Sequence, residues 1–191
     1  MNRNHKASLV FLGMLLFLLH PTVFADEKAE ALQLLREGRA VLVLRHALAP
    51  GTGDPPGFEI DDCSTQRNLN EEGRAQARAW KSFLREHGIE KARVLSSQWC
   101  RALDTAEEMD LGEVKEFPPL NSFFAGRGDR EEQSRKTIKQ VNAMGEGPPI
   151  ILVSHQVNIT ALTGIYPASN EGIIVRLPLE RGKGVLAEIT P

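Results

Sequence analysis

The sequence predicts an α/β protein, a three-layer α/β/α sandwich around a mostly parallel central sheet with an antiparallel edge. Two unbroken apolar runs, residues 41–44 and 150–153, are typical of inner strands that are covered on both faces. Segments with helical periodicity alternate with the predicted strands, which favours parallel pairing. The last two predicted strands are joined by a short glycine-containing turn and supply the antiparallel edge.

Local patterns predict each element. Asn70 precedes an acidic first turn and an apolar stripe, as the N-cap of a helix does. A helix over 99–109 follows directly on a short strand at 93–97, with Ser96 or Ser97 as its predicted cap. The remaining strands are predicted over 40–45, 114–117, 149–154, 172–179 and 184–189, and the remaining helices over 26–38, 70–88, 129–144 and 157–162.

The first 25 residues have the features of a secretory signal peptide. Arg3 and Lys6 precede an apolar run over 9–19 that is too short to span a bilayer, and small residues precede a predicted cleavage site after Ala25. An uncleaved N-terminal anchor is the alternative. We therefore expect an exported protein, periplasmic or secreted, with one domain over 26–191 and no stable membrane insertion after cleavage.

Composition sets limits on the function. The 191 residues are 41% hydrophobic and 25% charged, as in an ordinary globular domain. Removing the predicted signal peptide takes away Arg3 and Lys6 and changes the formal charge from −2 to −4. A mildly acidic chain gives no support for nucleic-acid binding. The sequence carries no signal for an oligomeric state.

A long irregular segment, residues 47–68, follows the first strand. It is rich in glycine and proline, and loops of this length in compact domains are often functional, so we expect it to cover a pocket. The two cysteines are Cys63, in this loop, and Cys100. In an oxidising compartment an even number suggests one disulfide, which would pin the loop to the segment around residue 100. Two buried thiols or half of a metal site are the alternatives.

Polar residues follow three of the predicted strands. They are the pair Arg45-His46, Ser97 together with Arg101, and the pair Ser154-His155. The carboxyl ends of parallel strands meet at one edge of a sheet, where open α/β folds bind ligands. Two arginines and two histidines are therefore expected in one pocket.

These residue types suit phosphoryl chemistry. Two guanidinium groups can donate bidentate hydrogen bonds to a tetrahedral dianion and stabilise the charge of a phosphoryl transition state. A neutral imidazole is a competent nucleophile near neutral pH. One histidine could attack phosphorus while the other binds a phosphoryl oxygen. A single such residue is usually structural, so the prediction depends on the four occurring at equivalent positions.

Four stretches together resemble the histidine phosphatase (phosphoglycerate mutase-like) superfamily, in particular its small exported members with an Arg-His-Ala motif. Leu44-Arg45-His46-Ala47 resembles the family's first motif. Three further stretches agree in order and spacing: residues 67–77 (RNLNEEGRAQA), 96–106 (SSQWCRALDTA) and 153–155 (VSH). The resemblance covers about residues 40 to 164.

The resemblance implies a phosphoglycerate mutase-like fold and a set of roles. His46 would be the phosphorylated nucleophile, and Arg45, Arg101 and His155 would bind the phosphoryl group. It also implies no metal and no cofactor. The chain departs from the family at the proton donor, because Ser122 and Gln156 occupy the two usual acid positions. Six other acids could substitute: Asp54, Glu59, Asp61, Asp62, Glu116 and Asp129.

The expected function is that of an exported phosphomonoesterase acting on a small phosphorylated substrate. A general acid phosphatase competes with a phosphatase for a cell-envelope phosphosugar, such as a phosphorylated lipopolysaccharide core heptose. The missing usual donor motivates a second class, a non-catalytic phospho-ligand binding module. A third class, a metallohydrolase using His46, His155 and loop carboxylates, is disfavoured because the two arginines oppose a further cation.

Overall fold

A computed structural model describes residues 21–191, with side chains from residue 27 onward. Most of the predicted signal peptide lies outside the described residues. Helix α1 (Pro21–Arg36) begins within it and continues across the predicted cleavage site, so cleavage after Ala25 stays a prediction. Of the described helices, none combines the length and the apolar character that crossing a bilayer requires.

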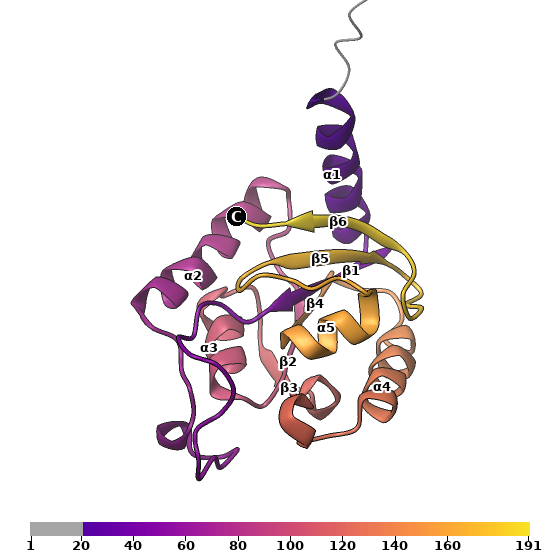
Figure 1. Ribbon diagram of the computed structural model, residues 1–191. Helices are drawn as coiled ribbons and strands as arrows, with labels where there is room; N and C mark the ends of the chain where they lie inside the picture. The colour runs from indigo at the N-terminus through magenta and orange to yellow at the C-terminus, as the bar shows by residue number, and fades with distance from the viewer. Residues whose placement is uncertain (1–20) are drawn as a thin grey trace, which may run out of the picture.

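The core is one six-stranded sheet in the order β3-β2-β4-β1-β5-β6 (Figure 1). Strands β3, β2, β4 and β1 are mutually parallel, while β5 pairs antiparallel with β1 and with β6. This confirms the predicted mostly parallel sheet with an antiparallel edge. The strands are β1 (Ala40–Arg45), β2 (Arg93–Ser96), β3 (Val114–Glu116), β4 (Ile150–Ser154), β5 (Gly172–Arg176) and β6 (Val185–Ile189).

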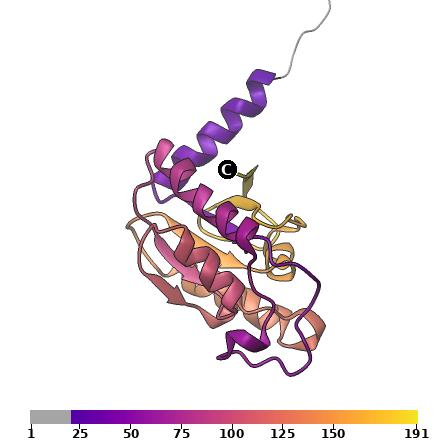
Figure 2. The ribbon, with the colours of Figure 1, turned by 90° about the vertical axis from the view of Figure 1, so that its left-hand side faces the viewer.

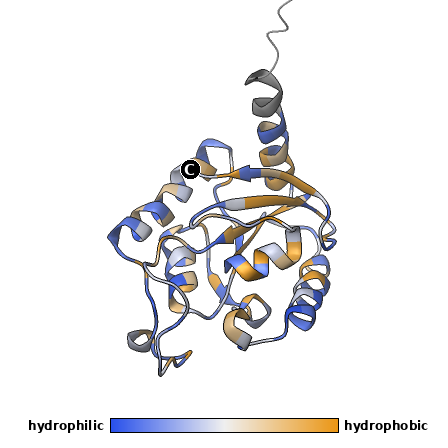
Figure 3. Ribbon diagram, in the orientation of Figure 1, coloured by the Kyte–Doolittle hydropathy of each residue, from blue (hydrophilic) through white to orange (hydrophobic). Residues whose placement is uncertain are grey.

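Helices cover both faces of the sheet, as the hydrophobic clusters show. On one face, side chains of α1, α2 (Glu71–Glu86) and α3 (Cys100–Glu108) pack against alternate residues of the inner strands. On the other face, α4 (Arg130–Asn142) and α5 (Gln156–Thr163) pack against the intervening residues. Figure 1 shows the two layers on opposite sides of the sheet, and Figure 2 shows α2 and α3 in front of it. Figure 3 shows apolar residues along the strands and both apolar and polar residues on the helices.

The predicted elements are present, with two informative differences. Asn70 caps α2 as expected, accepting a hydrogen bond from the backbone N–H of Gly73 at 2.8 Å. The N-cap of α3 is Trp99, without a side-chain cap, and not Ser96 or Ser97. Strand β5 ends at Arg176 instead of residue 179, because Pro178 cannot donate a ladder hydrogen bond.

The register of the sheet places the carboxyl ends of β1, β4 and β2 side by side. Arg45 of β1 is opposite Ser154 of β4, and Ser96 of β2 is opposite Val153. The residues that follow these strands therefore leave the sheet at the same edge. The loop 47–68 also leaves this edge, and its one helical turn is η1 (Cys63–Thr65).

The loop is fixed to the domain. A disulfide joins Cys63 to Cys100, the first residue of α3, as the sequence predicts. The side chain of Gln66 donates to the backbone oxygens of Glu59 and Ile60, at 3.0 and 2.8 Å, and accepts from the N–H of Cys100 at 3.0 Å. The loop therefore has a defined path beside the start of α3.

Candidate active site

The strand ends surround a cavity of about 170 Å³. All four residues predicted for the site line it, and the loop 47–68 forms part of its wall. The lining residues are Arg45, His46, Gly51, Thr52, Gly53, Asp54, Arg67, Arg101, Ser122, Phe124, His155, Gln156, Val157 and Tyr166.

His46 is held in one tautomer by two hydrogen-bond partners, one that can only accept and one that can only donate. Its Nδ1 lies 2.8 Å from the carbonyl oxygen of Ala47, which can only accept, so Nδ1 carries the hydrogen. Its Nε2 accepts from Nε of Arg101 at 3.2 Å, and a guanidinium can only donate. Both contacts leave the lone pair on Nε2.

Burial also keeps His46 neutral. The side chain is almost completely buried, and burial together with the nearby Arg101 charge lowers the pKa of His46 well below 6.5. The imidazole is therefore unprotonated at neutral pH. An unprotonated Nε2 in this tautomer has the electronic state that a nucleophile requires.

Arg101 connects the parts of the pocket. It lies in the first turn of α3, and only 3% of its surface is exposed. Besides contacting His46, its Nη1 donates to Asp54 Oδ1 at 2.8 Å and its Nη2 lies 3.5 Å from Nδ1 of His155. Burial lowers the pKa of Arg101 to about 10, so the group is still a cation at neutral pH.

His155 lies across the pocket from the first histidine, with the ring centroids of His46 and His155 5.3 Å apart. It follows β4 and is the N-cap residue of α5. The hydroxyl of Ser97 lies 2.8 Å from its Nε2, and the Trp99 ring packs edge-on against it. Burial, followed by the neighbouring His46 and Arg101, lowers the pKa of His155 well below 6.5.

Arg45 supplies a second guanidinium, some of whose N–H donors have no protein partner. Its Nη1 donates to the carbonyl oxygen of Pro167 at 2.9 Å, which orients the side chain at the pocket wall. Its Nε is buried and has no hydrogen-bond partner among the described residues. Such a donor is costly to bury unless a ligand satisfies it. Burial lowers the pKa of Arg45.

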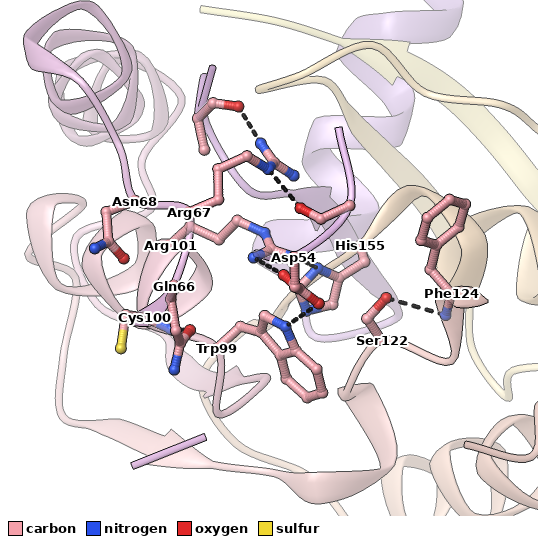
Figure 4. Close-up of polar contacts among 12 residues, drawn as sticks. Asp54, Gln66, Arg67, Asn68, Trp99, Cys100, Arg101, Ser122, Phe124 and His155 are labelled. Atoms are coloured by element: carbon pink, nitrogen blue, oxygen red, sulfur yellow. Dashed lines mark hydrogen bonds and ion pairs between the residues drawn. The ribbon is translucent and has the colours of Figure 1, made fainter. Parts of the chain in front are cut away.

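Arg67 is a pocket residue for which the sequence alone indicates no role. It is the first residue of the stretch 67–77, the second of the four that resemble the family. Its place in that stretch, shortly before the Asn70 cap of α2, is the sequence feature that could have indicated a role. Its guanidinium donates to the carbonyl oxygens of Ala49 and Gly53, the latter at 3.0 Å (Figure 4). It therefore holds the loop in place and adds a third positive charge to the pocket.

The structure also distinguishes among the six candidate acids. Asp54 is the one whose carboxylate lines the pocket, where it binds Arg101 and the indole N–H of Trp99 (Figure 4). Among the others, Glu116 accepts from Gln98, and Asp62 and Asp129 cap η1 and α4. Glu59 and Asp61 are exposed loop residues.

Ser122 and Gln156, which replace the usual acids, both line the pocket. The Ser122 hydroxyl accepts from the N–H of Phe124 at 3.3 Å, and the Gln156 amide donates to the Thr160 hydroxyl at 2.9 Å. Neither side chain is an acid, so the departure from the family is present in the pocket itself.

The mouth of the cavity has an aromatic rim. Three large hydrophobic side chains are exposed in the described part of the chain, and two of them, Phe124 (45%) and Tyr166 (72%), line this cavity. The inner wall is cationic and the outer wall is aromatic. The arrangement suits a ligand with an anionic end and a larger group that extends outward.

Three arginines, two neutral histidines and one carboxylate thus meet in a small cavity at the carboxyl edge of the sheet. The arginines can bind a tetrahedral oxyanion, and Nε2 of His46 can attack an atom held by them. Helix α5 begins at the wall and adds the positive end of its dipole. Among the side chains from residue 27 onward, no group of three or more His, Cys, Asp or Glu residues is arranged to hold a metal ion.

Such a site on a phosphoglycerate mutase-like sheet defines a class of phosphoryl-transfer proteins, and a sequence comparison identifies it. Residues 41–129 match the model of the histidine phosphatase superfamily (branch 1). The sequence motifs, this match and the fold all agree with the histidine phosphatase superfamily. The match ends before His155, whose place in the pocket comes from the structure. No curated protein sequence matches the chain.

Solved structures share the fold. The protein histidine phosphatase SixA complexed with tungstate superposes with a TM-score of 0.57 at 22% identity, over 80% of this chain and 97% of SixA. The putative phosphohistidine phosphatase SixA from Agrobacterium tumefaciens gives 0.56 at 18%, over 81% and 99%. Mycobacterial glucosyl-3-phosphoglycerate phosphatase with VO3 gives 0.53 at 17%, over 72% and 92%. At these identities the similarity establishes the fold.

Proposed function

We propose that the protein is an exported, metal-independent phosphomonoesterase that hydrolyses phosphate esters through a phosphohistidine on His46. The observation that carries the proposal is the state of His46: a neutral imidazole whose Nε2 lone pair faces a pocket of guanidinium groups. The SixA structure of the same fold was obtained with tungstate, a tetrahedral oxyanion similar to phosphate. Both features support phosphate as the bound group.

In the first step, the phosphoryl group binds between Arg45, Arg101 and His155. The lone pair of His46 Nε2 attacks phosphorus, and the bond to the ester oxygen breaks with its electron pair on that oxygen. The Nδ1 hydrogen of His46 remains bonded to the Ala47 carbonyl, which stabilises the positive charge on the ring. In the second step, water attacks phosphorus, and the electron pair of the P–N bond returns to Nε2.

The substrate class follows from the shape and composition of the cavity. A volume of about 170 Å³ accommodates a phosphoryl group with a small part of its ester group, so the rest must lie at the mouth. There the exposed rings of Phe124 and Tyr166 offer flat apolar surfaces of the kind that pack against sugar rings. We therefore propose a phosphosugar substrate, and the predicted export signal favours one from the cell envelope.

Hydrolysis of an activated aryl phosphate by the mature chain, residues 26–191, tests the proposal. The assay runs from pH 4 to 8 with a chelator, beside the His46→Ala variant. We expect chelator-resistant turnover in the wild type and none in the variant. Phosphate binding without turnover in either protein would instead identify a non-catalytic phospho-ligand binding module, and activity lost with the chelator would identify a metallohydrolase.

A further inference from the structure

We infer that Asp54 is the proton donor of the reaction, taking the role for which the usual family positions hold Ser122 and Gln156. The inference rests on the proposed function. Asp54 is in the loop 47–68, outside both usual positions, and only its place in the folded chain distinguishes it from the other five candidate acids.

The carboxylate of Asp54 is buried and fully bonded. Only 4% of the side chain is exposed. Oδ1 accepts from Nη1 of Arg101 at 2.8 Å, and Oδ2 accepts from the indole Nε1 of Trp99 at 3.1 Å and lies 3.4 Å from Nε of Arg127. A carboxylate with three cationic or N–H partners has a fixed position in the pocket.

The guanidinium of Arg101 contacts both the Asp54 carboxylate and the proposed nucleophile, His46. Arg101 contacts Nε2 of His46 through its Nε and Asp54 through its Nη1. A phosphoryl group that binds the same guanidinium therefore has both the nucleophile and the carboxylate as neighbours. In-line attack requires the leaving oxygen on the side of phosphorus opposite His46. Asp54 contacts a different nitrogen of the guanidinium from His46, and it is the carboxylate in the pocket lining that can serve that oxygen.

The surrounding contacts hold Asp54 in place without help from a substrate. The ring of Phe58 stacks on Trp99, with centroids 5.1 Å apart, and the guanidinium of Arg127 lies 4.4 Å from the Phe58 ring centroid. Arg67 binds the carbonyl oxygen of Gly53, directly before Asp54. The Cys63–Cys100 disulfide anchors the same loop beside Arg101. General acid catalysis depends on such preorganisation.

Proton balance is satisfied by a substrate that binds as the monoanion. The phosphoryl group and Asp54 contact the same guanidinium, and the phosphoryl proton passes to the Asp54 carboxylate. When His46 attacks, the ester bond breaks and the leaving oxygen takes this proton from Asp54, so an alcohol departs. The Asp54 carboxylate then removes a proton from the water that cleaves the phosphohistidine. That proton then passes from Asp54 to the phosphate product, which leaves as the monoanion and restores the carboxylate. Protons and charge are therefore conserved over the cycle.

The test compares esters whose leaving groups differ in their need for protonation. An aryl phosphate with an acidic phenol leaves as the anion, whereas an alkyl phosphate such as glycerol phosphate needs the proton. We expect Asp54→Asn to lower kcat/KM for the alkyl ester by about 100-fold or more. The loss for the aryl ester should be much smaller. Asp54→Glu, which keeps an acid, should recover part of the alkyl activity.

Asp61→Asn is the matched control, because Asp61 is an exposed acid of the same loop. It should resemble the wild type with both esters. A loss in Asp54→Asn that is equal for both esters, or a gain with both, would overturn the inference, since removing a structural ion pair or a competing anion does not depend on the leaving group. A wild type that hydrolyses neither ester would overturn the proposed function, and this inference with it.

Discussion

Nε of Arg101 donates a hydrogen bond to Nε2 of His46 at 3.2 Å. The two residues are 55 positions apart and come from different strand–helix units. This contact has two consequences. It helps to fix the tautomer in which Nε2 carries no hydrogen, and in the proposed mechanism it places a permanent cation where a bound phosphoryl group accumulates negative charge.

The first prediction concerns Arg101→Lys. A lysine has one compact charge and cannot contact His46, Asp54 and a phosphoryl oxygen from separate nitrogens. We expect kcat/KM for an aryl phosphate to fall about 100-fold, as for other losses of a transition-state donor. Arg78→Lys is the control and should retain activity, because Arg78 of α2 is exposed and pairs with Glu108 of α3 outside the pocket lining. Activity near that of the wild type in Arg101→Lys would contradict the assigned role.

The second prediction concerns Ser97 as a positioning residue for His155. Its buried hydroxyl lies 2.8 Å from Nε2 of the histidine. Ser97→Ala should lower kcat/KM about fivefold, because a buried hydrogen bond contributes about 1 kcal/mol.

Ser96→Ala is the matched control for Ser97→Ala. Ser96 is also buried, but its hydroxyl bonds the backbone oxygen of Ser97. Steady-state kinetics and urea unfolding of both variants separate the two effects. An equal change in activity for both variants would show that the loss reflects packing and not the position of His155.

The third prediction concerns the pH dependence of stability. The pKa values of His46 and His155 in the folded protein are well below 6.5. Below pH 6.5 the unfolded chain therefore binds protons that the folded chain does not. The free energy of unfolding should be unaffected by these groups above pH 6.5 and should fall below it, by about 1.4 kcal/mol per pH unit for each histidine.

Urea unfolding at pH 7.5 and at pH 5.5 measures this dependence. Replacing one histidine, as in His155→Asn, should flatten the dependence even if it lowers stability at both pH values. A variant with the slope of the wild type would show that His155 is not held neutral.

The fourth prediction concerns the disulfide. Cys63 and Cys100 are 37 residues apart, and a crosslink of this span stabilises a protein by about 4 kcal/mol in the chain-entropy model. Replacing both cysteines by serine should lower the free energy of unfolding toward this amount. It should also lower activity with alkyl esters more than with aryl esters, since the loop carries Asp54. Wild-type selectivity in the double variant would show that the loop keeps its position without the crosslink.

Much of the fold was predictable because the inner strands are continuous apolar runs. The runs ending at Arg45 and Ser154 have no polar residue to permit a solvent-exposed face, so parallel strands buried on both sides were the natural interpretation. The shared edge then follows from topology alone. For this reason Arg45, His46, Arg101 and His155 could be placed together without coordinates.

The positions of Asp54 and Arg67 could not be predicted in the same way. Both lie in an irregular loop, whose path depends on contacts between distant side chains: the disulfide, Gln66 with Cys100, and Phe58 on Trp99. No periodicity encodes such contacts. Ser97 shows the same limit, because a serine before a helix suggests a cap, whereas in the folded chain its hydroxyl contacts His155.

The most direct test of the account is to trap the intermediate. The chain over residues 26–191 would be mixed with an activated aryl phosphate, quenched with alkali within one turnover, digested and analysed by mass spectrometry. We expect one phosphoryl group on His46 in the wild type and none in His46→Ala. Turnover without a phosphorylated protein, or a phosphoryl group on a residue other than His46, would contradict it.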